Sequence, residues 1–140
     1  EEVLPVWRDQ LWPGRKSKIE PTSAMRYLGG DDMQNMQFVP VFFSLTTDRI
    51  IAINSVVMCA DGSARSRGLW VDPSFRNKGY ARIVLENSII QARDWGAKHL
   101  WTIPRQSSWP AYKNVGFIQT SDWFSEGVEF GPNCYASMTL

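Results

Sequence analysis

The stretch that decides the fold is Val71-Asp72-Pro73-Ser74-Phe75-Arg76-Asn77-Lys78-Gly79-Tyr80-Ala81. An apolar, strand-like segment ends at Val71, and a segment with helical spacing begins near Tyr80. The first N–H groups of a helix lack partners within the helix, so the loop that leads into a helix is a ready site for an anion. Gly79 would let the backbone approach such an anion closely. The stretch therefore predicts a strand, an anion-binding loop and a helix in succession.

The residues after the loop predict one amphipathic helix over 81–95. The residues that share its apolar face at 3.6-residue spacing are Ala81, Val84, Leu85, Ser88, Ile89, Ala92 and Trp95. Gly96 is expected to end the helix, and residues 98–103 predict a short buried strand. A strand, a crossover helix and a second strand imply a parallel strand pair.

Three antiparallel strands are predicted ahead of the loop, over residues 37–46, 49–60 and 65–71. Turn signals at Thr47-Asp48 and Asp61-Gly62 separate them, which favours a meander. Further upstream we expect a helical segment over residues 3–11, a basic loop over 14–18, and a helix that starts at Pro21-Thr22-Ser23 and ends at Gly29-Gly30.

The last part of the chain predicts a short helix over residues 110–115 and two strands over 116–123 and 134–140. The predicted fold class is therefore α/β (α+β), with a mixed, mostly antiparallel central sheet that contains one parallel pair and is flanked by helices. Because 140 residues is the usual size of one domain, we expect a single domain over residues 1–140.

Composition excludes several classes of protein. The 15 Lys and Arg residues balance 14 Asp and Glu residues, so no nucleic-acid partner is expected. No apolar run is long enough to span a membrane, and the first residues do not resemble a signal peptide. With two cysteines and one histidine, His99, we expect no metal site and no disulfide framework, a surface position for His99, and a cytoplasmic location.

Three motifs, in this order, resemble those of the GCN5-related N-acetyltransferase (GNAT) superfamily. Arg76-Asn77-Lys78-Gly79-Tyr80-Ala81 is similar to its loop pattern [Q/R]-x-x-G-x-[G/A]. Leu69-Trp70-Val71-Asp72-Pro73 resembles the strand end before that loop, and Tyr112-Lys113-Asn114-Val115-Gly116-Phe117 resembles its Y-x-x-x-G-F motif. Residues 135–140 resemble its closing strand. The resemblance covers about residues 38–140.

The resemblance implies a sheet that splays between the strand ending at Val71 and the strand ending at Ile103, with acetyl-CoA bound in the opening as acetyl donor. Backbone groups of the first strand would pair with the pantetheine arm, and the N–H groups of residues 77–81 would hold the diphosphate. The implied cofactor-binding residues are Leu69, Trp70, Val71, Arg76, Asn77, Lys78, Gly79, Tyr80, Ala81 and Arg82.

The resemblance implies that Tyr112 is the catalytic residue, which would protonate the leaving thiolate. The expected reaction is direct transfer of the acetyl group to a small-molecule or peptide amine, with the N–H of Val71 as oxyanion donor. The general base stays unassigned among Asp122, Glu126, Glu129 and a water chain. The family also implies a homodimer and a first strand that is missing or truncated here.

Departures from the family pattern keep alternatives open. Many members carry Glu on the strand where this chain has Arg65-Ser66-Arg67, and Arg105 stands where Asn is common. A non-catalytic module on the same fold is therefore the second hypothesis. It would bind CoA as a ligand or have a regulatory role, or it would use Arg65, Arg67 and the basic loop over residues 14–18 on nucleic acid. The acceptor is open among an α-amino group, an aminoglycoside, a polyamine and a protein lysine, and the acyl group is open as well.

Overall fold

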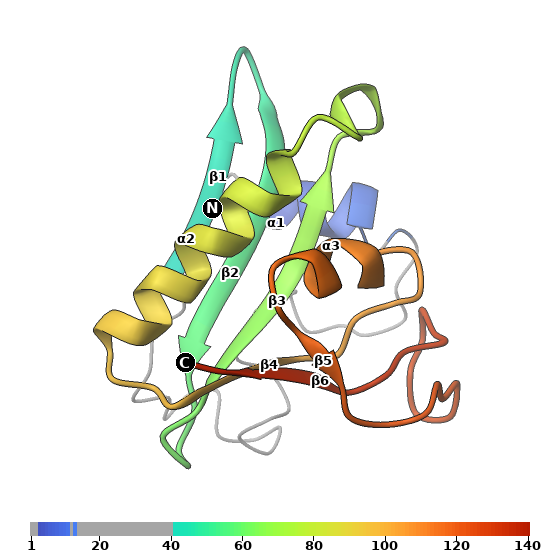
Figure 1. The fold of residues 1–140 in the computed structure, drawn as a ribbon. Helices are drawn as coiled ribbons and strands as arrows, with labels where there is room; N and C mark the ends of the chain where they lie inside the picture. The colour runs from blue at the N-terminus through green and yellow to red at the C-terminus, as the bar shows by residue number, and fades with distance from the viewer. Residues whose placement is uncertain (1–2, 12, 14–40) are drawn as a thin grey trace.

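The computed structural model describes residues 3–11, 13 and 41–140 (Figure 1). The basic loop predicted over 14–18, the helix predicted from Pro21 and residues 37–40 of the first predicted strand lie outside the described residues. Among the described residues, no helix combines the length and the apolar character needed to cross a membrane.

A six-stranded sheet in the order β1-β2-β3-β4-β6-β5 forms the centre of the molecule. Its strands are β1 (Val41–Thr46), β2 (Ile50–Met58), β3 (Ala64–Val71), β4 (His99–Thr102), β5 (Ile118–Gln119) and β6 (Ala136–Thr139). All neighbours are antiparallel except β3 and β4, which are parallel. The predicted meander, the parallel pair and the mixed sheet are confirmed.

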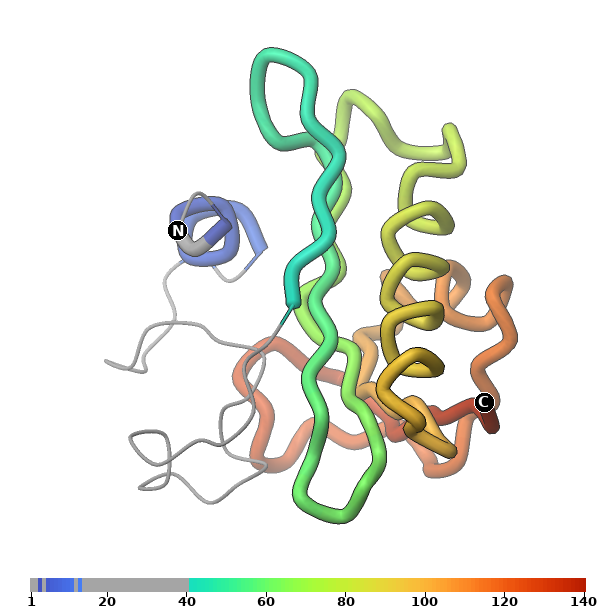
Figure 2. Tube along the Cα trace, turned by 90° about the vertical axis from the view of Figure 1, so that its left-hand side faces the viewer, coloured from blue at the N-terminus to red at the C-terminus, as the bar shows by residue number. Residues whose placement is uncertain are grey.

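Helices cover the two faces of β1–β3 (Figure 2). On one face lies α2 (Tyr80–Asp94), and on the other lie α1 (Val3–Val6) and the π-helical turn η1 (Trp7–Leu11). The short helices are η3 (Pro73–Phe75) and α3 (Trp109–Asn114). Each face has its own apolar core, a large one beneath α2 and a small one in which Trp7 contacts Ile53 and Trp70.

The predicted helix over 81–95 is confirmed as α2, because its apolar stripe faces the sheet and Gly96, at φ +82°, follows its end. The last two strands are shorter than predicted. Residues 120–135 form a loop that joins them. Within this loop, Phe124 and Asn133 pair as an isolated β-bridge. Gly127 and Gly131-Pro132 lie within this loop and do not favour regular strand pairing.

β3 contains a bulge at Gly68. Ile53 of β2 faces Trp70, whereas Ser55 faces Arg67, so two steps along β2 match three steps along β3. Gly68 has φ +77°, a backbone conformation that favours glycine. Because one extra residue reverses the alternation of side chains, the bulge places Trp70 in the core beneath η1, on the face that Arg67 also occupies.

The bulge also holds the N-terminal helical segment in place. The indole Nε1 of Trp7 donates a hydrogen bond to the carbonyl of Gly68 at 3.0 Å, and Trp7 is fully buried. A Cβ added at Gly68 would lie 2.1 Å from Cζ2 of Trp7. The close approach of ring and backbone therefore requires glycine at this position.

The sheet opens between β3 and β4 after two residue pairs. Ala64 faces Leu100 and Arg65 faces Trp101, and beyond them β3 has no described partner on the β4 side. β4 instead stays paired with β6 through Thr102. Figure 1 shows the two strands diverging from this point. The predicted splay at the parallel pair is confirmed.

We expect both cysteines to resist thiol reagents in the folded chain. Cys59 and Cys134 are at most 2% exposed, and burial raises the pKa of both thiols, so little reactive thiolate is present near neutral pH. Ellman's reagent at pH 8 should titrate no thiol within minutes in buffer and two thiols in 8 M urea. A thiol that reacts at the same rate in both solvents would contradict this burial.

Candidate active site

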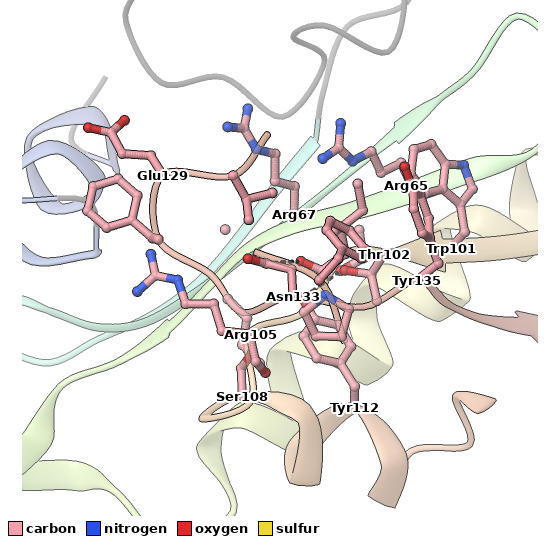
Figure 3. Close-up of a pocket in the computed structure, with 18 of the residues that line it drawn as sticks. Arg65, Arg67, Trp101, Thr102, Arg105, Ser108, Tyr112, Glu129, Asn133 and Tyr135 are labelled. Atoms are coloured by element: carbon pink, nitrogen blue, oxygen red, sulfur yellow. Dashed lines mark hydrogen bonds between the residues drawn. The ribbon is translucent and has the colours of Figure 1, made fainter. Parts of the chain in front are cut away.

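A cavity of about 720 Å³ lies where β3 and β4 diverge. Its walls are formed by β3, β4, the segment between β4 and α3, and the loop between β5 and β6. Leu11 of η1 also lines it. The polar and aromatic side chains that line it include Arg65, Ser66, Arg67, Trp101, Thr102, Arg105, Ser108, Tyr112, Glu126, Glu129, Asn133 and Tyr135 (Figure 3).

Tyr112 brings a buried hydroxyl to this cavity from α3. Its side chain is 2% exposed, and its ring packs edge-on against Phe117 with centroids 5.1 Å apart. Its hydroxyl lies 3.5 Å from Oγ of Ser66. Burial raises the pKa of Tyr112, while hydrogen bonds with Ser66 and Thr102 and the charge of Arg65 lower it to a lesser extent. Tyr112 is therefore a protonated donor at neutral pH.

A buried polar network lies behind Tyr112. Nδ2 of Asn54 donates to the hydroxyls of Ser66 and Ser88 at 2.9 and 2.8 Å, and the Ser66 hydroxyl lies 3.0 Å from Oδ1 of Asn54. All three side chains are fully buried. The network links the middle of β2, β3 and α2 to the Tyr112 hydroxyl. The sequence analysis missed it, although an asparagine within the apolar run of β2 was a visible signal.

Two arginines reach the cavity from β3. The guanidinium of Arg65 lies 4.9 Å from the centre of the Trp101 ring, and Arg67 extends in the same direction (Figure 3). Both flank Ser66, whose side chain points to the opposite face of the strand toward Asn54. Both arginines line the cavity, whereas the loop over residues 76–82 does not.

Arg105 approaches the cavity from the segment before α3. Its Nη2 donates to the carbonyl of Leu11 at 2.7 Å, and its guanidinium lies 5.1 Å from the centre of the Phe130 ring. Burial lowers the pKa of Arg105, but an arginine remains charged at neutral pH. Arg105 thus connects η1 with the loop between β5 and β6.

The loop before α2 lies at the far end of β3 from Arg65. Asn77 and Gly79 have φ of +62° and +83°, and no side chain caps the helix that begins at Tyr80. Its first N–H groups therefore have no partner within the helix. Nε of Arg76 donates to the carbonyl of Val71 at 3.1 Å, which holds this side chain against the open end of the strand.

The neighbouring charged side chains of the loop have contacts of their own. Arg82 forms an ion pair of 2.7 Å with Glu86 on the surface of α2, and the Lys78 ammonium lies 5.4 Å from the centre of the Phe75 ring. The Asp72 carboxylate accepts a hydrogen bond from the backbone N–H of Ser74 at 2.8 Å, which restrains the turn. That hydrogen bond, with the Arg49 guanidinium, holds the pKa of Asp72 below its ordinary value.

The backbone of β3 presents alternate residues to the opening. The N–H of Asp72 donates to the carbonyl of Ile51 in β2 at 2.7 Å. The hydrogen-bonding direction of the backbone alternates along a strand. The N–H and carbonyl groups of Val71 and Leu69 therefore point away from β2, and those of Trp70 point toward its partner Ile53. The expectation that Trp70 offers backbone bonds to a ligand in the opening does not fit this pairing.

Of the other residues considered in the sequence, some line the cavity and others lie elsewhere. Glu126 and Glu129 line the cavity and are exposed, whereas Asp122 is exposed and lies outside its lining. His99 is exposed at the start of β4, as predicted. Trp101 is the tryptophan in the cavity wall, and Trp109 packs against the core beneath α2.

Comparisons with known proteins identify the family and support the fold. The family model for the acetyltransferase (GNAT) family matches residues 7–117. The chain therefore belongs to the GNAT family, whose members are acyltransferase enzymes. The family predicted from the sequence motifs is confirmed. A search of curated proteins found no significant sequence match.

Solved structures share the fold at low sequence identity. An acetyltransferase from Bacillus cereus has a TM-score of 0.64 at 18% identity, with 74% of this chain and 75% of that chain covered. An N-acetyltransferase-like protein from Lactobacillus plantarum has a TM-score of 0.63 at 19% identity, covering 78% and 74%. The ribosomal-protein-S18-alanine N-acetyltransferase from Escherichia coli has a TM-score of 0.58 at 20% identity, covering 71% and 68%.

Proposed function

We propose that this chain transfers the acetyl group of acetyl-CoA directly to a primary amine. One observation carries the proposal: the open edge of β3 leads from an uncapped helix N-terminus at Tyr80 to a cavity that contains a buried tyrosine hydroxyl. Acetyl-CoA contains, in order, a diphosphate, a linear arm with amide groups and a thioester. The proposed anion site, the open strand edge and the proposed proton donor follow the same order.

The residues proposed to hold the donor follow from this arrangement. Leu69 and Val71 have backbone groups on the open side of β3 and would pair with the pantetheine amides. The N–H groups of residues 77–81 and the side chain of Arg76 would hold the diphosphate. Lys78 would add a positive charge nearby. Arg82 would contribute less, because Glu86 already neutralises it.

The chain's own groups would divide the chemical work among them. Bound acetyl-CoA supplies the acetyl group as a thioester. The N–H of Val71 would stabilise the negative charge that develops on the carbonyl oxygen when the amine nitrogen bonds to the carbonyl carbon. Tyr112 would give its hydroxyl proton to the sulfur as the carbon–sulfur bond breaks. Glu126, Glu129 or water would take the proton of the amine.

Two glycine variants test the donor site against a matched control. Gly79→Ala should weaken acetyl-CoA binding by about ten-fold, because it strains the loop and adds a Cβ where the phosphates approach. Gly62→Ala introduces the same left-handed strain, φ +85°, in the turn between β2 and β3, also with no atom within 4 Å. It should leave the affinity unchanged. Titration calorimetry with acetyl-CoA measures both.

Arg76→Gln should also weaken acetyl-CoA binding by about ten-fold, as expected for one charge-assisted hydrogen bond. Equal affinities for the Gly79, Arg76 and Gly62 variants would move the donor site elsewhere. Binding of acetyl-CoA without release of free CoA in the presence of any amine would favour the alternative, a CoA-binding module on the same fold.

A further inference from the structure

The hydrogen bonds around Ser66 leave its hydroxyl hydrogen with a choice of two acceptors. Nδ2 of Asn54 has two hydrogens, and it donates to the hydroxyl oxygens of Ser66 at 2.9 Å and of Ser88 at 2.8 Å. The Ser88 hydroxyl donates in turn to the carbonyl of Val84 at 3.2 Å. The hydroxyl hydrogen of Ser66 can therefore point to Oδ1 of Asn54, 3.0 Å away, or to the hydroxyl oxygen of Tyr112, 3.5 Å away.

The two directions of this hydrogen suit the two states of Tyr112. When it points to Asn54, a lone pair of the Ser66 oxygen can accept the hydrogen of the Tyr112 hydroxyl. When it points to Tyr112, Ser66 becomes a donor to the tyrosine oxygen. A rotation about one carbon–oxygen bond therefore converts Ser66 from an acceptor into a donor. The 3.5 Å contact is long, as is common for catalytic groups in a free enzyme, and such contacts tighten when substrate binds.

A buried tyrosine that gives away its proton needs such a donor. Tyr112 is 2% exposed, so little water can solvate the negative charge that would develop on its oxygen. Burial raises the pKa of Tyr112 for this reason, and the hydrogen bonds with Ser66 and Thr102 and the charge of Arg65 oppose that rise. Ser66 is itself fully buried, and its contacts with Asn54 hold its oxygen in place on β3. It is therefore a preorganised donor for the tyrosine oxygen.

We infer that Ser66 is a positioning residue for acetyl transfer, whose hydroxyl turns from Asn54 to the Tyr112 oxygen as Tyr112 gives its proton to the departing sulfur. The inference rests on the proposed function, which assigns the proton donation to Tyr112. In this step the carbon–sulfur bond breaks, its electron pair goes to the sulfur, and the sulfur takes the proton of Tyr112. Ser66 keeps its own proton and changes only its hydrogen-bond partner. Between turnovers, Tyr112 regains a proton from solvent through the cavity that it lines.

The first test is a double-mutant cycle in kcat. Ser66→Ala should lower kcat for acetyl transfer by about ten-fold, as expected for one hydrogen bond to a developing charge. The affinity for acetyl-CoA should stay unchanged. In the Tyr112→Phe background, Ser66→Ala should have no further effect on kcat, because the oxygen on which Ser66 acts is absent. Steady-state release of free CoA and titration calorimetry with acetyl-CoA measure the two quantities.

Ser55→Ala is the matched control for Ser66→Ala. Ser55 is also a fully buried serine of the sheet, and its hydroxyl donates to the carbonyl of Arg67 at 2.7 Å. Its variant should lower the melting temperature, as Ser66→Ala does, and keep the kcat of the unmodified chain. If Ser66→Ala does not fold, Ser66→Cys takes its place. A thiol is similar in size to a hydroxyl but a weak donor, so this variant should lower kcat as well.

The second test reads the hydrogen bond without turnover. In a chain with tyrosine labelled by ¹³C at Cζ, the signal of Tyr112 is the one that Tyr112→Phe removes. This signal should shift in Ser66→Ala and stay in place in Ser55→Ala, because the tyrosine hydroxyl loses a partner in the first variant alone. A signal that stays in place in Ser66→Ala would overturn the contact and the inference with it.

The outcomes separate this inference from the proposed function. If Tyr112→Phe loses activity while Ser66→Ala keeps its kcat, the inference is overturned and the proposed function stands. A loss in Ser66→Ala that persists at full size in the Tyr112→Phe background would overturn the inference as well, because Ser66 would then act by another route. No acetyl transfer by the unmodified chain would overturn the proposed function together with the inference, even where the ¹³C signal still reports the hydrogen bond.

Discussion

Tyr112→Phe should lower kcat for acetyl transfer by about 100-fold or more and leave the affinity for acetyl-CoA unchanged. The substitution removes the proposed proton donor but keeps the ring, which packs against Phe117 in the core beneath α2. Ser66 retains its hydrogen bonds with Asn54. Steady-state release of free CoA and calorimetry with acetyl-CoA measure the two quantities.

The pH dependence of kcat gives a second signature of the same residue. Burial raises the pKa of Tyr112, so its protonated form, which is the proposed donor, persists beyond the ordinary tyrosine value of about 10. Ionisation of Tyr112 therefore cannot produce a fall in kcat between pH 7 and 10. A change in that range would report the acceptor amine or its base.

Tyr135→Phe is the matched control for Tyr112→Phe. Tyr135 also lines the cavity, but it is 48% exposed and lies outside the buried network. Its variant should keep a kcat close to that of the unmodified chain. If both variants lose the same activity, or if Tyr112→Phe keeps full activity, Tyr112 is not the proton donor.

Gly68→Ala should be the most destabilising single substitution of a small residue in β3, with a loss of about 3–5 kcal/mol in the free energy of unfolding. The new Cβ would lie 2.1 Å from the Trp7 ring, and φ +77° would be strained for alanine. Trp7 would have to leave its buried site, and η1 with it. For a chain of this size the melting temperature should fall by about 10–17 °C.

Gly62→Ala separates the two contributions to that loss. It has the same backbone strain, φ +85°, but its Cβ would meet no atom within 4 Å. The difference between the two variants in urea unfolding is therefore the cost of displacing Trp7. Trp7→Ala should make Gly68→Ala less harmful, because the clash is gone. Equal losses for Gly62→Ala and Gly68→Ala would contradict the contact.

Local sequence signals predicted the elements around the open edge. Gly79 and Gly96 mark the two ends of α2, and the helical stripe between them places Leu85 and Ile89 on the sheet. These signals were readable because each acts within a few residues. Tyr112 was predicted as a site residue from its motif. Its burial beside Ser66 could not be read from the sequence, because the two residues are far apart along the chain.

The side-chain directions in β3 could not be predicted from the sequence. A strand with strict alternation would put Arg65, Arg67 and Leu69 on one face, but the bulge at Gly68 shifts every residue after it. Nothing local identifies this glycine as bulged, because the partner that requires it is Trp7, 61 residues earlier. The separation of Arg65 and Arg67 from the phosphate loop follows from the same long-range geometry.

Because β3 and β4 separate after two residue pairs, the rest of β3 is an open strand edge within the sheet. Beyond Arg65, no described strand satisfies the outward N–H and carbonyl groups of β3 on that side. Such an edge is a template for any extended chain, including another copy's strand. A bound linear amide would occupy it as a strand does. Occupancy of the proposed donor site would thus also protect against aggregation, and the empty chain would be the form most exposed to it.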